Sequence, residues 1–127
     1  MLTVGQQFTL QREVRPEHTA DVLGNPGVMV LGTPMLVSFA EVACHQLLLP
    51  HLKPGQGTVG TAVNIRHIKA TPLGMSVTIV ATLREVDRRR YLFDVEGRDA
   101  RHQILSGQHE RFVLELAPFL AGLQQPA

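Results

Sequence analysis

Apolar and polar residues alternate over long stretches of the second half of the chain, which is the pattern of half-buried β-strands. Four strands are expected from this alternation, at residues 58–70, near 77–83, near 91–95 and at 103–116. The segments between them read TPLG, DRRR and RDARH, and each predicts a turn. Gly107, inside the last strand, is expected at a β-bulge. We therefore expect an antiparallel meander of four strands.

The first third of the chain has a different pattern. Residues 6–14 show the mixed alternation of an edge strand, and residues 15–34 contain three prolines and three glycines, which predicts an ordered loop or lid. Thr33 followed by Pro34 is a strong helix start, because a threonine oxygen can cap free N–H groups and proline is tolerated at the first helical position. The helix is expected to end near Leu49, where a proline follows.

This predicted helix is apolar on most of its circumference, which is typical of a helix that is buried on most sides. Its polar residues Ser38, Glu41 and His45 stand at i, i+3 and i+7, so they share one narrow stripe. We expect a sheet to wrap the helix and the stripe to face a cleft or a subunit interface. An unpaired carboxylate in apolar surroundings is costly, so Glu41 either pairs with His45 or has a chemical role.

Composition and charge narrow the class of protein. The 127 residues carry 12 Lys and Arg against 11 Asp and Glu, which is expected for one globular domain over residues 1–127 and gives no sign of nucleic-acid binding. The one basic cluster, residues 88–90 beside Asp87, is typical of a solvated turn. With a single cysteine, no signal-peptide pattern and no apolar stretch long enough for a membrane span, a soluble cytoplasmic protein is expected.

No metal or other cofactor is expected. Four histidines show no spacing typical of metal ligands, and His45 and His51 stand too far apart around a helix to share an ion. Those four are His18, His51, His102 and His109. Cys44 has apolar neighbours, which favours a buried and inert thiol over a nucleophile.

Three segments together resemble one family. TPMLVSFAEVAC, LKPGQGTVGTAVNIRHIKATPLGMSV and SGQHERFVL are similar to the hotdog-fold thioesterases of the fluoroacetyl-CoA thioesterase-like family, over residues 33–116. The resemblance implies an α+β hotdog fold, in which a five-stranded antiparallel sheet wraps one long central helix. It also implies a homodimer or a higher assembly, with two helices side by side beneath a continuous sheet and active sites at the interface.

The same resemblance implies five site residues. Thr33, Glu41 and His67 match residues that act together in catalysis. Gly60 matches a glycine whose backbone N–H lies near the reacting carbonyl, and Arg111 matches an arginine at the substrate pocket. The implied substrate is an acyl-CoA thioester, cleaved to CoA and a free acid.

The chemistry of these residue types agrees with that assignment but leaves alternatives open. Thioester hydrolysis needs a nucleophile or a base that activates water, and a carboxylate such as Glu41 can do either. His67 can shuttle the proton of the leaving thiolate, or it is a satisfied core histidine. Thr33 orients the site, or it is only a helix cap. Eight residues of helix rise about 12 Å, so the thioester lies between Thr33 and Glu41, or both subunits contribute.

Other side chains have a structural alternative too. Arg111 is a pocket residue, or a strand arginine that pairs with Glu110 or Glu115. Arg89 and Arg90 could meet the phosphates of CoA, because guanidinium groups suit phosphate geometry.

Two departures from the family bear on the substrate. The segment between the first strand and Thr33 is shorter here and has no phenylalanine, whereas the fluoroacetyl-CoA enzyme has an aromatic lid, so fluoroacetyl specificity is not expected. Pro34 stands where the family has a small residue after the threonine.

We predict a thioesterase that acts on a small or medium acyl-CoA. The rival interpretation is a non-catalytic protein that binds acyl-CoA or a small acid, and a dehydratase ranks third.

Overall fold

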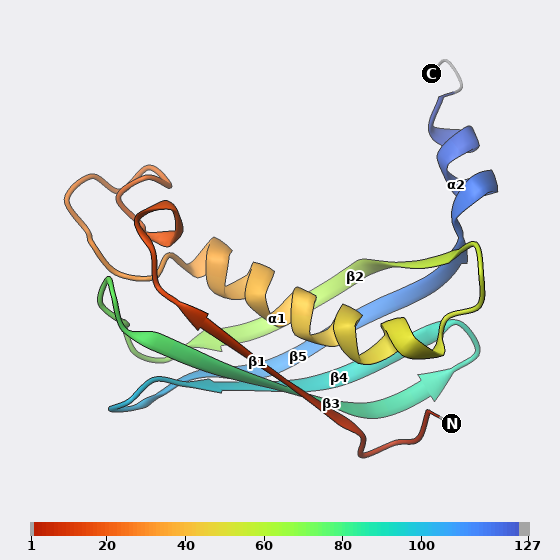
Figure 1. Ribbon diagram of the computed structural model, residues 1–127, viewed down its shortest axis with the longest axis horizontal. Coiled ribbons are helices and arrows are strands. Elements are labelled where there is room, and N and C mark those ends of the chain that lie inside the picture. The colour runs from red at the N-terminus through yellow and green to blue at the C-terminus, as the bar shows by residue number, and fades with distance from the viewer. Residues whose placement is uncertain (1, 125–127) are drawn as a thin grey trace.

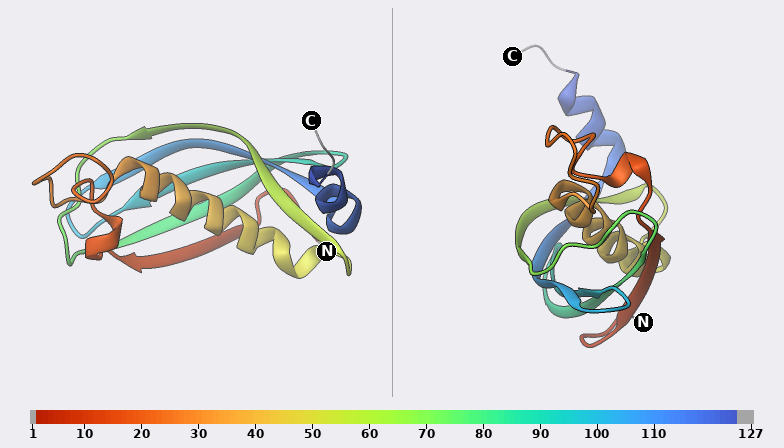
Figure 2. Two further views of the ribbon diagram at one scale, coloured as in Figure 1. Left: turned by 90° about the horizontal axis from the view of Figure 1, so that it is seen from above. Right: turned by 90° about the vertical axis from the view of Figure 1, so that its left-hand side faces the viewer.

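One antiparallel sheet curves around a single long helix in the computed structural model, which describes residues 2–124 (Figures 1 and 2). The elements in chain order are β1 (Gln7–Glu13), the 3₁₀ helix η1 (Pro16–His18), α1 (Thr33–Leu48), the 3₁₀ helix η2 (Leu49–His51), β2 (Gln56–His67), β3 (Ser76–Asp87), β4 (Arg90–Arg98), β5 (Gln103–Glu115) and α2 (Leu116–Leu123). All the predicted strands and the predicted helix are present, with small shifts at their ends.

The order of strands across the sheet is β1-β3-β4-β5-β2, and every neighbouring pair is antiparallel. The prediction of a four-stranded meander is therefore wrong for β2, which pairs with β5 and not with β3. Alternation identifies a strand but not its partner. The chain enters β2 only after α1 has crossed the sheet, so β2 lies at the edge opposite β1 (Figure 1). The expected edge position of β1 is confirmed.

The predicted bulge at Gly107 is also wrong. Gly107 stands opposite Ile65 in an unbroken stretch of the β2–β5 ladder. A glycine is needed here because the backbone of β2 approaches it closely: a Cβ at this position would lie 2.3 Å from the carbonyl oxygen of Asn64. The bulge is instead in β2, where Gly60 pairs with Arg111 and Ala62 pairs with Glu110. Thr61 therefore has no paired residue across the ladder.

The core lies between α1 and the concave face of the sheet. Its strand residues include Val77, Ile79, Ala81 and Leu83, the alternating set predicted for β3, and all four are completely buried. From α1 the core takes Leu36, Phe39, Ala40, Ala43, Cys44, Leu47 and Leu48. The alternating set predicted for β2 contains no buried residue, because β2 is an edge strand and the bulge has shifted its alternation. Val63 keeps 42% of its surface exposed. The set consists of Val59, Thr61, Val63, Ile65 and His67.

The segment between β1 and α1 is the ordered loop that was predicted. Two isolated bridges hold it, Thr19 with Leu31 and Val30 with Pro72. It also exposes apolar side chains, namely Val22, Leu23 and Met29. We refer to residues 19–31 as the lid loop.

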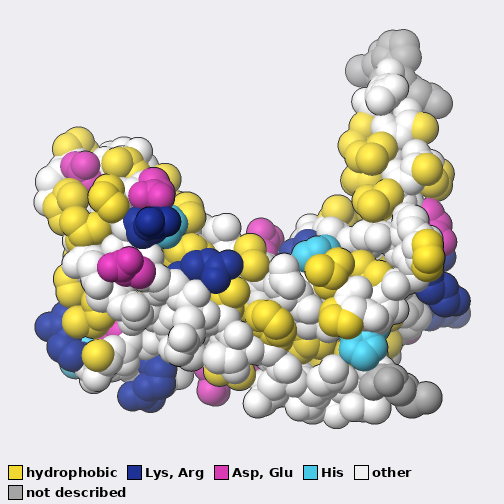
Figure 3. All heavy atoms as spheres, in the orientation of Figure 1, with side chains coloured by type: hydrophobic (Ala, Val, Ile, Leu, Met, Phe, Trp, Pro, Cys, Tyr) yellow, Lys and Arg dark blue, Asp and Glu magenta, His cyan; other side chains and the backbone are white. Residues whose placement is uncertain are grey.

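The helix α2 was not expected, since the predicted strand ran to residue 116 and no helix was placed after it. It rises from the end of β5 and stands away from the body of the molecule (Figures 1 and 3). None of its residues is buried, although four are large and apolar: Leu116, Phe119, Leu120 and Leu123. Neither α2 nor any other helix within residues 2–124 is long and apolar enough to cross a membrane.

Candidate active site

The polar stripe of α1 opens onto a pocket, as its spacing predicted. The pocket has a volume of about 300 Å³. It is lined by Ser38, Glu41, Val42 and His45 of α1 together with Thr58 of β2 and Arg111 of β5. The carboxylate that looked out of place in an apolar helix therefore faces a cleft.

Glu41 is held closely against β2. A Cβ on Gly60 would lie 2.6 Å from Glu41 Oε1, so only glycine leaves room for the carboxylate in this position. The same oxygen lies 4.0 Å from His109 Nε2, and the side chain of Glu41 keeps 41% of its surface exposed. The alternative pairing of Glu41 with His45 is not present, because His45 Nδ1 instead hydrogen bonds with Thr58 Oγ1 at 2.6 Å.

Arg111 is buried and extends toward the pocket. Its Nε donates to Thr58 Oγ1 at 2.9 Å and its Nη2 donates to the Thr58 carbonyl at 3.1 Å. Burial lowers the pKa of the guanidinium, and the nearby carboxylate of Glu41 acts against that shift. The alternative in which Arg111 pairs with Glu110 or Glu115 is wrong. Glu110 pairs with Arg90 at the start of β4, and Glu115 pairs with Arg89 in the preceding turn.

His109 joins this group, although the sequence analysis gave it no role in the site. It is almost completely buried. Its Nδ1 lies 2.9 Å from the Ala62 carbonyl and its Nε2 lies 3.1 Å from Arg111 Nη1. Burial is the largest cause that lowers the pKa of this imidazole. The signal in the sequence was its spacing, because residues two apart on a strand share a face, and His109 precedes Arg111 by two.

Thr33 and His67 form a second group. Thr33 Oγ1 and His67 Nδ1 are 2.7 Å apart. Thr33 is not the helix cap that was predicted: Gly32 is the N-cap, no side chain caps the helix, and the Thr33 hydroxyl turns to the strand instead. Burial lowers the pKa of His67, and a weaker backbone interaction with Lys69 acts in the opposite direction. The other ring nitrogen, Nε2, is shielded from solvent and has no partner among the described residues.

Within one chain the two groups stand apart. Gly60 and His67 are seven residues apart on β2, which corresponds to roughly 20 Å of strand. Thr33 and Glu41 are separated by about 12 Å of helix. The structure thus brings Glu41 to Gly60 and brings Thr33 to His67, but it makes no hydrogen bond between one pair and the other within residues 2–124.

Two other kinds of chemistry would depend on Cys44 or on a cluster of metal ligands. Cys44 is completely buried, and burial raises the pKa of its thiol to about 12, so it does not supply a thiolate nucleophile at neutral pH. Over residues 2–124, no three His, Cys, Asp or Glu side chains gather closely enough to hold a metal ion.

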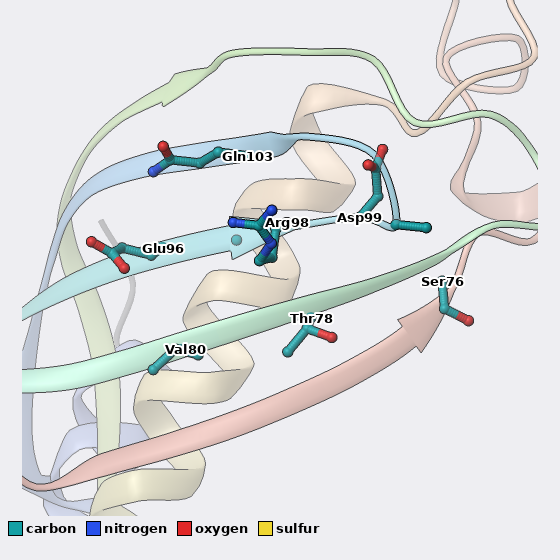
Figure 4. A pocket seen from close by; sticks show the side chains of 9 residues that line it. Ser76, Thr78, Val80, Glu96, Arg98, Asp99 and Gln103 are labelled. Carbon is teal, nitrogen blue, oxygen red and sulfur yellow. The ribbon is translucent and has the colours of Figure 1, made fainter.

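A hollow larger than this pocket lies elsewhere. It is a groove of about 630 Å³ on the outer face of the sheet, with α1 behind the strands (Figure 4). Its charged side chains come from Glu96, Arg98 and Asp99. None of the site residues predicted from the sequence lines this groove, so its size does not mark the chemistry.

Comparison with known proteins finds relatives that match almost the whole chain. Residues 14–117 match the family model described as fluoroacetyl-CoA-specific thioesterase. The fluoroacetyl-CoA thioesterase of Streptantibioticus cattleyicolor is 38% identical over 98% of this chain and 94% of its own length.

Solved structures are similar over the same length. A phenylalanine-to-alanine variant of the fluoroacetyl-CoA-specific thioesterase is 37% identical, with a TM-score of 0.94 over 98% of this chain and 97% of that one. The same variant has been solved with fluoroacetate and CoA. A hot-dog-like protein from Thermanaerovibrio acidaminovorans, 18% identical, has a TM-score of 0.87 over 98% of this chain and 94% of its own, which confirms the predicted hotdog fold. The chain belongs to the fluoroacetyl-CoA-specific thioesterase family.

Proposed function

We propose that this protein hydrolyses the thioester of a small or medium acyl-CoA to CoA and a free acid. Membership of a thioesterase family supports this activity, and one relative has been solved with CoA. The observation in this chain that carries the proposal is the half-exposed carboxylate of Glu41, held against the Gly60 backbone beside Arg111 in an open pocket.

The proposed roles follow from the chemistry of each group. The Gly60 N–H polarises the thioester carbonyl, and Arg111 binds the substrate. Glu41 attacks the carbonyl carbon to form an anhydride that water then cleaves, or it takes a proton from the water that attacks. The bond to sulfur breaks in either route. His67 gives a proton to the leaving thiolate, and Thr33 orients its ring through the hydrogen bond to Nδ1.

We further propose that each site is completed by two copies of the chain, in a homodimer. The distance along β2 between Gly60 and His67 is too long for one small acyl group to meet both in the same subunit. An antiparallel pairing of two β2 edges about a twofold axis between Val63 and Asn64 would set Gly60 opposite His67 of the partner subunit. The half-exposed Val63 and the unpaired edge of β2 support this arrangement.

The ends of the molecule support the same partner. The lid loop projects at one end of β2 and α2 projects at the other, so that the surface between them is concave (Figures 1 and 3). Both ends expose large apolar side chains. A twofold axis exchanges the two ends, so the lid loop of one copy would meet α2 of the other, and both apolar surfaces would be covered.

Mixing two inactive variants tests the activity and the shared site together. Glu41→Gln and His67→Ala should each lower thiol release from acetyl-, propionyl- or butyryl-CoA by orders of magnitude. If Glu41 works with His67 of the partner subunit, refolding equal amounts together should restore about a quarter of the wild-type activity, because half of the dimers are mixed and each has one intact site.

Glu96→Gln and His102→Ala, both exposed and outside the pocket, are the matched controls and should keep wild-type activity. Near-full activity of both site variants would contradict the assigned roles. Absence of recovery on mixing would show that the site is not shared between subunits. A wild-type protein that is stabilised by CoA esters but releases no thiol would instead be a binding protein.

A further inference from the structure

We propose that His109 is a positioning residue of this site, which acts as a neutral imidazole and holds the Arg111 guanidinium and the β2 bulge in place beside Glu41. The inference rests on the proposed function, because it assigns a role in the same reaction. It comes from contacts that family resemblance did not supply. His109 is almost completely buried on β5, and it contacts the Ala62 carbonyl of β2 and the Arg111 guanidinium at the point where Glu41 meets β2.

The proton positions on the His109 ring follow from its neighbours. A carbonyl oxygen only accepts hydrogen bonds, so the contact between Nδ1 and the Ala62 carbonyl requires a hydrogen on Nδ1. A guanidinium only donates, so the contact between Arg111 Nη1 and Nε2 requires a bare Nε2. Both contacts are satisfied only by the neutral tautomer, and a protonated ring would set two cations against each other.

The bond to Nε2 completes the fixation of Arg111. Thr58 holds Nε and Nη2 through its hydroxyl and its carbonyl, and His109 holds Nη1, so all three nitrogens of the planar group have an acceptor. No Arg111 nitrogen lies within 4.0 Å of a Glu41 oxygen, as the ion pairs of residues 2–124 show. His109 thus keeps the cation near the carboxylate without letting the two pair directly, and Glu41 stays free to act as nucleophile or base.

The bond from Nδ1 fixes the other side of the site. Ala62 is the first paired residue after the bulge at Thr61, and its carbonyl receives the His109 hydrogen bond. A bulge disrupts the regular ladder, so a side-chain hydrogen bond there restrains a segment that the ladder does not. Gly60 immediately precedes the bulge, and a Cβ on it would lie 3.0 Å from His109 Cε1. His109 therefore also sets how closely the Gly60 backbone approaches Glu41.

Two amide variants separate these roles. In His109→Asn, the side-chain NH₂ can replace Nδ1–H and keep the bond to the Ala62 carbonyl, but the acceptor for Arg111 is lost. In His109→Gln, the longer side chain places its oxygen near the position of Nε2 and keeps the acceptor, while the bond to Ala62 is lost. His102→Asn, at an exposed position, is the control.

We expect His109→Asn to lower kcat for the best acyl-CoA substrate by about tenfold or more, because a displaced Arg111 pairs with Glu41. His109→Gln should recover most of that loss. In an Arg111→Lys background, His109→Asn should cause little further loss, since a residue that acts through Arg111 has nothing left to position. Equal losses in the Asn and Gln variants that simply follow their melting temperatures would overturn the proposal, and so would full additivity with Arg111→Lys.

A crystal structure of His109→Asn provides a readout that does not depend on turnover. It should show an Arg111 nitrogen within ion-pair distance of Glu41, and an unmoved guanidinium would overturn the proposal. If the wild-type protein releases no thiol from any acyl-CoA, the proposed function fails, while this structural result still decides whether His109 holds Arg111.

Discussion

At the scale of single residues, the site depends on the absence of a side chain as much as on the side chains present. Glu41 is identified from sequence because it is a carboxylate in an apolar helix. Gly60 and Arg111 are implied only by the family resemblance, and His109 is not identified at all, because these residues come from two strands that meet α1 only in the folded chain. Gly60 leaves the space that the Glu41 carboxylate occupies, so the two residues form one geometric unit.

Gly60→Ala tests this unit. The added methyl group would lie 2.6 Å from Glu41 Oε1, which is closer than real contacts allow, so the carboxylate must move away. We expect kcat/KM for acyl-CoA hydrolysis to fall by at least about tenfold, as measured by thiol release, while the protein still folds. Gly122→Ala is the control, because a Cβ there meets no atom within 4 Å. Unchanged activity in Gly60→Ala would contradict the position assigned to Glu41.

At the scale of elements, the pairing of β2 with β5 positions the residues of the site. His109 and Arg111 lie on β5, Gly60 lies on β2, and the ladder between these strands sets their distances. Gly107 allows this ladder to close, since a Cβ on it would lie 2.3 Å from the Asn64 carbonyl and 2.6 Å from the Ile65 Cα. These are backbone atoms, so the strands themselves would have to separate to relieve the contact.

Gly107→Ala should therefore lower the free energy of unfolding by roughly 1–3 kcal/mol, because a paired strand must shift to accept the methyl group. Chemical denaturation monitored by circular dichroism measures this loss. Gly122→Ala again serves for comparison and should be neutral or slightly stabilising, since alanine favours the helix by roughly 0.5–1 kcal/mol over glycine. A change below about 0.5 kcal/mol in Gly107→Ala would show that the two strands are not held this closely.

At the scale of the whole molecule, three partly or fully buried histidines make stability depend on pH. The pKa values of His45, His67 and His109 are all lowered from the ordinary 6.5, and burial is the largest cause for each. In acid the unfolded chain therefore binds more protons than the folded chain. The stability that the neutral imidazoles allow is complete above the unfolded pKa, and it decreases as the pH falls below it toward the folded pKa values.

Denaturant unfolding at two pH values measures this effect. The free energy of unfolding should be lower at about pH 5.5 than at about pH 7.5, the range in which the unfolded histidines gain their protons. His109→Gln removes the most buried of the three imidazoles, so the difference between the two pH values should become smaller. Equal stability of the wild-type protein at both values would contradict the lowered pKa values.

The sequence by itself determined the five strands and the long helix α1, but not α2, and it marked Glu41 as an unusual residue. Alternation located the strands, Thr33 and Pro34 located the start of α1, and the family motifs identified the hotdog fold, because these signals are local or depend on the order of residues. Only the tertiary structure decided that β2 pairs with β5, that the bulge lies beside Gly60, and that His109 joins the site. These depend on contacts between segments far apart in the chain, for which alternation within one segment holds no information about the partner.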